Sequence, residues 1–150
     1  MYPPPQPSLP YPLKSYRTVA TQTASPGQLV LMLYDGAIRA LERALTGFQH
    51  QDPLDFNQTI NNNLLHAWEI INELDNSLDL ARGGELAATL RRLYRFMNRQ
   101  LLNSNARKSP EGIHDTLRRL NALRDAWSQM LRQREQPAAA EPFEALAAVS

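Results

Sequence analysis

Apolar residues recur every three or four positions through most of this chain, a spacing that places them on one side of a helix. At the start of the first such run, Ser25 is a favourable N-cap residue and Pro26 follows at the first helical position, where its missing N–H has no intrahelical partner. We therefore predict a helix from Pro26 to about Gln49. Its apolar stripe is Leu29, Met32, Leu33, Ala37, Ala40, Leu41, Ala44, Leu45 and Phe48.

A second apolar set lies partly round the same predicted helix. It consists of Val30, Leu31, Tyr34 and Ile38. One buried stripe is enough to attach a helix to a core, so this helix is more apolar than a single contact requires. The surplus predicts a second contact, either with another helix or with a partner.

Three further helices follow from the same periodicity. Asp52 and Pro53 repeat the cap-and-proline signal, and we expect the helix that begins there to end at Arg82, because the paired glycines Gly83 and Gly84 favour a left-handed stop. Its apolar stripe is Phe56, Ile60, Leu64, Ala67, Ile71, Leu74 and Leu78.

The next two helices are expected from about Glu85 to Asn105, and from the third cap-and-proline pair, Ser109 and Pro110, to about Arg134. Alternating apolar and polar residues, the mark of a strand, are absent from the sequence. Short connections make neighbouring helices antiparallel. The predicted fold is all-α, an antiparallel up-down-up-down four-helix bundle with a short N-terminal strap or helix.

Proline marks the ends of this predicted domain. Residues 1–12 hold six of the 11 prolines, which predicts a flexible lead in extended conformation. Residues 13–136 are expected to form the bundle, with 13–24 as a strap whose largest anchor is Tyr16. Residues 137–150 are alanine-rich with two prolines, and we expect a mostly disordered tail.

Composition narrows the class of protein. A length of 150 residues suits one domain with its own core, and the absence of cysteine excludes disulfides and thiolate metal sites. The proline-rich start lacks the apolar segment of a signal peptide, and no apolar run reaches the roughly 20 residues of a membrane span. We expect a cytoplasmic, soluble protein that does not insert into membranes.

The net charge of +1 hides a strong asymmetry. Residues 35–80 carry eight acidic and two basic residues, whereas 82–135 carry 12 basic and five acidic ones. Most of these arginines are expected to be solvated on helix surfaces, although a basic outer face for an acidic partner is the alternative. A nucleic-acid interface is disfavoured, because no recognised domain pattern and no interleaved aromatic residues accompany the cluster. The cluster consists of Arg91, Arg92, Arg95, Arg99, Arg107, Lys108, Arg118 and Arg119.

Catalysis and metal binding find little support in the sequence. A di-iron bundle needs two Glu-x-x-His pairs on different helices, and only one pair, Glu111 and His114, is present. Glu111 is explained by its favourable position in the first turn of a helix. The glycine pair lacks the lysine and the spacing of a phosphate-binding loop. We predict no catalytic residues, no metal site and no cofactor.

Five blocks in order along the chain make it similar to flagellar secretion chaperones of the FliS type. They are Tyr16, SPGQLVLMLYDGAI (Ser25–Ile38), EIINELDNSLD (Glu69–Asp79), GGELAATLRRLY (Gly83–Tyr94) and DAW (Asp125–Trp127). The resemblance covers about residues 11–135. It implies a cytoplasmic helical bundle that binds the C-terminal segment of flagellin, prevents its premature polymerisation, aids its export through the flagellar type III apparatus, and catalyses no reaction.

The resemblance and the apolar surplus together suggest a groove for the cargo, with Tyr16 as a movable cover. The candidate lining residues share apolar or aromatic character, and core packing is an equal explanation for Tyr34 and Leu93, as it is for the neighbouring Leu33. They are Leu31, Tyr34, Ile38, Ile71, Leu78, Leu93 and Tyr94.

Other partners remain open at this point. An export-gate component is a further candidate partner. The main alternative function is a self-associating adaptor that buries the same surplus in a homodimer and carries another cargo. A nucleic-acid-binding or metal-binding bundle is less favoured.

Overall fold

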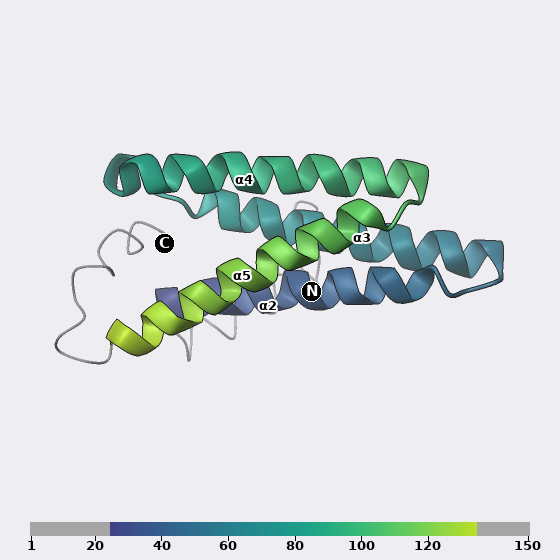
Figure 1. Ribbon diagram of the computed structural model, residues 1–150, viewed down its shortest axis with the longest axis horizontal. Coiled ribbons are helices and arrows are strands. Elements are labelled where there is room, and N and C mark those ends of the chain that lie inside the picture. Colours follow the sequence, from purple (N-terminus) through teal and green to yellow (C-terminus); the bar gives the residue numbers. More distant parts are fainter. Residues whose placement is uncertain (1–24, 135–150) are drawn as a thin grey trace, which may run out of the picture.

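The computed structural model describes residues 25–134, which form four helices arranged up-down-up-down (Figure 1). They are α2 (Pro26–Gly47), α3 (Pro53–Asn76), α4 (Leu80–Arg107) and α5 (Glu111–Arg134). Over this part of the chain the predicted all-α bundle is confirmed. The expectations for the lead, for the strap with Tyr16 and for the tail lie outside the described residues.

The predicted start signals cap two of the helices. The Ser25 hydroxyl accepts a hydrogen bond from the Gln28 N–H at 3.2 Å, and an Asp52 carboxylate oxygen accepts one from the Asp55 N–H at 3.0 Å. Both prolines stand at the start of their helices, where an orphan donor would otherwise face no partner. The ring of Phe48 meets Phe56 edge-on across the short connection, with centroids 5.5 Å apart. Local sequence thus defines the α2–α3 hairpin.

The predicted boundary between the second and third helices was wrong. We expected the second helix to continue to the glycine pair, but α3 ends at Asn76 and Leu78 lies in the connection. Asp79 begins α4 instead, because its side chain accepts a hydrogen bond from the Arg82 N–H at 3.2 Å. Gly84 then breaks the helical conformation with φ 54°, so the regular part of α4 follows it.

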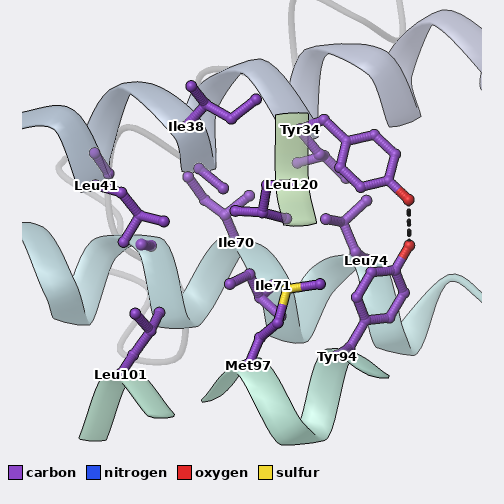
Figure 2. Packing of buried hydrophobic residues seen from close by; sticks show 14 of the residues in the cluster. Tyr34, Ile38, Leu41, Ile70, Ile71, Leu74, Tyr94, Met97, Leu101 and Leu120 are labelled. Carbon is purple, nitrogen blue, oxygen red and sulfur yellow. Dashed lines mark hydrogen bonds between the residues drawn. The ribbon is translucent and has the colours of Figure 1, made fainter. Parts of the chain in front are cut away.

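The helices close into a ring in which α2 packs on α3 and α5, and α4 packs on the same two helices. In Figure 1, α5 crosses the bundle obliquely, from the α4 side near the α4–α5 connection towards α2. The fully buried core comes from all four helices and includes Leu41, Ile70, Met97 and Leu120 (Figure 2).

Most of the apolar surplus of α2 is used by the bundle itself. Val30 is fully buried, and Tyr34 and Ile38 are 3% and 8% exposed, so the predicted second contact is with other helices at these positions. Leu31 is only half-buried and packs against the edge of the core. Within residues 25–134, no helix is both long and apolar enough to cross a membrane.

Candidate binding site

The candidate lining residues divide into a buried group and a half-buried pair. Tyr34, Ile38, Ile71 and Tyr94 lie in one packed cluster between α2, α3 and α4 (Figure 2), and Leu78 is also buried. Leu31 on α2 and Leu93 on α4 are half-buried against the same core. The surface available at this place is therefore much smaller than the sequence predicted, and Tyr16, its proposed cover, lies outside the described residues.

Two tyrosines join α2 to α4 in the middle of this cluster. The hydroxyls of Tyr34 and Tyr94 share a hydrogen bond of 2.5 Å, drawn as the dashed line in Figure 2. Burial raises the pKa of Tyr34 to about 12, partly offset by the hydrogen bond from Tyr94. Burial also raises the pKa of Tyr94, and the neighbouring Tyr34 adds to the effect. Both hydroxyls are protonated at neutral pH, so each can donate and accept.

Polar pairs flank the apolar contact between α3 and α4 at several levels. The Asn98 amide donates to the Asn72 side-chain oxygen at 2.9 Å, and the Asn105 amide donates to the Asn61 oxygen at 2.8 Å. These amides lay on helix faces that the sequence analysis left unassigned. Asparagine is mostly found at exposed positions, so only the spatial pairing identifies these amides as contacts.

A buried carboxylate completes this seam. Asp75 is 8% exposed, and its two oxygens face Arg91 at 2.9 Å and Arg95 at 3.6 Å. Asp35 of α2 is paired in the same way, with Arg124 of α5. A buried carboxylate requires such partners, because desolvation disfavours its charge.

Helix α5 changes partners along its length. Near its start, the Gln100 amide of α4 donates to Asp115 at 2.6 Å, and the Arg119 guanidinium lies 5.0 Å from the centre of the Phe96 ring. Further along, Arg124 pairs with Asp35 of α2 at 2.8 Å.

The last turns of α5 lie against the start of α2. The Trp127 indole donates to the Gly27 carbonyl at 2.7 Å, and a Cβ at Gly27 would lie only 2.6 Å from Leu131. Gly27 is thus the close-approach residue that lets α5 settle here. Side chains of α4 thus contact the early part of α5, and those of α2 contact its later part.

Five large apolar side chains of the described helices are exposed, and the sequence analysis did not assign any of them to a surface. Three of them, Leu80, Phe96 and Leu102, lie on α4 and are 41%, 36% and 49% exposed. The remaining two, Leu54 and Leu65, lie on α3. All five lie outside the apolar stripes of the predicted helices, and this position in the sequence could have indicated that they are exposed.

The polar residues of the described helices assemble no metal site. No group of three or more His, Asp or Glu side chains in residues 25–134 is placed to hold an ion. Glu111 accepts a hydrogen bond from the Ser109 hydroxyl, which lowers the pKa of Glu111, and it therefore serves the start of α5. His66 is half-buried on α3, and its burial lowers its pKa.

Fold and contacts together define an antiparallel four-helix bundle over residues 25–134. The family described as "Flagellar protein FliS" matches residues 10–134 of this chain. The flagellar secretion chaperone FliS of Salmonella typhimurium is 34% identical over 126 residues, covering 79% of this chain and 88% of that protein. The Bacillus subtilis and Escherichia coli proteins of the same name are 31% and 35% identical, covering 80% and 75% of this chain and 86% and 80% of their own lengths. The chain belongs to the FliS family.

Proposed function

We propose that this protein is a cytoplasmic export chaperone that binds the C-terminal segment of flagellin, keeps it from polymerising, delivers it for export and catalyses no reaction. The observation that carries the proposal is the family match across residues 10–134, with relatives named flagellar secretion chaperones. An amphipathic segment that assembles in a filament carries an apolar face while monomeric, and a chaperone covers such a face with apolar area of its own.

We place the binding groove at the α2–α4 side of the bundle, around the tyrosine pair. Leu31 and Leu93 form its accessible rim, and Tyr34, Ile38 and Tyr94 form its floor. Because the floor is buried in the free chain, we propose that the cargo reaches it only when covering side chains move, and that Tyr16 is one of them.

A shift of α4 away from α3 would help to uncover the floor, and the polar pairs between these two helices keep its cost in free energy moderate. A hydrogen bond exchanged for one to water changes stability by only about 1 kcal/mol net. The α3–α4 pairs Asn72–Asn98 and Asn61–Asn105 can therefore be replaced by water at moderate cost. Moderate binding also suits a chaperone, since the cargo has to be released.

The test is calorimetric titration of the full chain with the C-terminal segment of flagellin from the same organism. We expect a one-to-one complex with a strongly negative heat-capacity change, the mark of apolar burial coupled to folding of the segment. No heat at several temperatures, together with separate elution of chain and segment in gel filtration, contradicts the proposed cargo. A stable homodimer under the same conditions favours the self-associating adaptor.

The rim is tested with one variant and a matched control. Leu93→Gln removes an apolar contact at the rim, and Leu102→Gln makes the same change at an exposed position of the same helix. We expect Leu93→Gln to weaken cargo binding at least about tenfold, equivalent to about 1.4 kcal/mol, and Leu102→Gln to leave it unchanged. Equal affinities of the two variants for the cargo would show that the groove does not lie beside Leu93. Charged substitutions at Tyr34 or Ile38 are unsuitable, because a buried carboxylate would disrupt the fold itself.

A further inference from the structure

Helix α4 carries a basic face that its packing leaves open. Between Leu86 and Arg107 the chain holds five arginines and no acidic residue. Within the described residues, Arg99 has no acidic partner, and Arg92 donates only to the Thr89 hydroxyl, at 3.1 Å. Two of the exposed apolar residues of α4, Phe96 and Leu102, lie beside these cations. We call this surface the α4 basic face: Arg92, Arg95, Phe96, Arg99 and Leu102.

A segment of opposite character follows α5 in the same chain. Residues 135–150 contain three glutamates and no lysine or arginine. Glu141 and Glu144 alternate with Phe143 and Leu146, so acidic and apolar side chains occur within one short stretch. This matches the α4 basic face in both charge and apolar content. We propose that residues 135–150 dock in cis on the α4 basic face.

The length of the chain fits this docking. From Arg134 back to Arg119, which contacts Phe96, α5 covers about 22 Å at about 1.5 Å per residue. From Arg134 to Glu141, an extended proline-containing chain covers about the same 22 Å at about 3.1 Å per residue. Glu141–Leu146 therefore reach the level of Phe96 when the segment runs back along α5. Arg92 lies nearer still to the end of α5, because α4 and α5 are antiparallel.

Other occupants suit this face less well. One side of the Phe96 ring is covered by the Arg119 guanidinium, so the ring offers a base only part of its stacking surface. A membrane surface requires a broad apolar stripe, whereas here two apolar side chains are separated by arginines. A tethered segment has an effective concentration in the millimolar range, so even weak complementary contacts populate the docked state.

Paramagnetic relaxation tests this proposal directly on the full chain. The chain contains no cysteine, so Ala148→Cys gives a single attachment site for a spin label. We expect loss of amide signal at Arg92–Arg99, relative to the same sample with the label reduced, and no such loss at Arg43 on α2. The loss should disappear at high salt, since the Debye length falls from about 30 Å at about 0.01 M to about 3 Å at about 1 M.

Charge reversal provides the matched comparison. Arg99→Glu should abolish the signal loss on α4, whereas Arg43→Glu, a change at another exposed arginine, should leave it intact. Adding Glu144→Lys to Arg99→Glu should restore it in part. Absence of signal loss on α4 in the unmodified background, or a loss that ignores salt and charge, overturns the proposal.

A mixed sample separates docking in cis from docking between copies. Isotope-labelled chain without the spin label is combined with spin-labelled chain that carries no isotope. Signal loss on α4 in this sample shows contact with a second copy and overturns docking in cis. None of these measurements involves cargo, so their outcome is independent of the proposed chaperone function.

Discussion

The two sides of α3 are built in different ways. Towards α2 the contact is dry and close: Ala37, Ala40 and Ala44 are fully buried, and a Cβ at Gly47 would lie 2.8 Å from a side-chain carbon of Ile60. Towards α4 the apolar contact, which includes Met97, is flanked by paired amides and the Asp75–Arg91 ion pair. Apolar interdigitation strongly resists separation, whereas partly buried polar pairs can exchange their partners for water at a smaller net cost in free energy. The bundle thus combines a firm hairpin with a helix that can separate more easily.

Shortening a buried side chain in the α2–α3 contact should produce the largest loss of stability. Ile60 is fully buried beside Gly47, so we expect Ile60→Ala to lower the free energy of unfolding by about 2–5 kcal/mol through lost transfer energy and a residual cavity. Urea denaturation measures this value. Leu54→Ala on the same helix is the control, since Leu54 is 62% exposed and its loss should change stability by less than about 0.5 kcal/mol. Similar losses of stability in the two variants would contradict the close packing described for the α2–α3 contact.

The tyrosine pair should make stability depend on pH in the alkaline range. An unfolded tyrosine has a pKa near 10, whereas burial raises that of Tyr34 to about 12. Between these values the unfolded chain binds fewer protons, so stability is complete below about pH 10 and falls as the pH rises towards 12. The loss from Tyr34 alone is roughly 3 kcal/mol.

A conservative variant isolates this contribution. Tyr34→Phe should flatten the alkaline decline in urea denaturation midpoints, although it also leaves the Tyr94 hydroxyl without its partner. At neutral pH that orphaned hydroxyl should lower stability by about 1–3 kcal/mol, and adding Tyr94→Phe should recover part of the loss. An unchanged alkaline slope in Tyr34→Phe would assign the decline to other groups.

Weakening the polar seam should affect α4 selectively. Asn98→Ala removes the donor to Asn72, and we expect a loss of about 1 kcal/mol together with faster amide hydrogen exchange in α4. Exchange of the α2–α3 hairpin should change much less. Uniform acceleration across all four helices would show that α4 does not separate independently of the hairpin.

The smallest effect is expected where α5 meets α2 at the surface. The Asp35–Arg124 pair is about one-third exposed on both sides, so Asp35→Asn should lower stability by less than about 1 kcal/mol, and salt should reduce the difference. Asp125→Asn is the control, because Asp125 also faces Arg124, at 3.4 Å, but is 74% exposed. A large loss at Asp35 would indicate a structural role beyond the ion pair.

The sequence predicted the elements better than the contacts between them. The capping residues Ser25 and Asp52 act locally, so their effect could be read from the chain alone. Asp79 caps α4 in the same way, but we did not predict a helix start there, because the glycine pair was interpreted as the end of the preceding helix. In the structure Gly84 is a kink within α4.

The candidate site depended on information that periodicity does not carry. The surplus of α2 was recognised, yet only the spatial arrangement shows that Tyr34 and Ile38 are buried while Leu31 remains at the edge. The amide pairs of the α3–α4 seam join residues distant in sequence, and the oblique course of α5 arises from the close approach at Gly27. Such features follow from three-dimensional complementarity rather than from local propensity.

The contact of Trp127 and Leu131 with Gly27 brings the beginning and the end of the described chain to the same end of the bundle. A bundle closed in this way is suited to circular permutation, with the start of α2 and the end of α5 joined by a linker and new ends opened at Gln49–Gln51, in the α2–α3 connection. Such a permutant would present purification tags and fluorescent reporters at the end of the bundle opposite to Gly27 and Leu131.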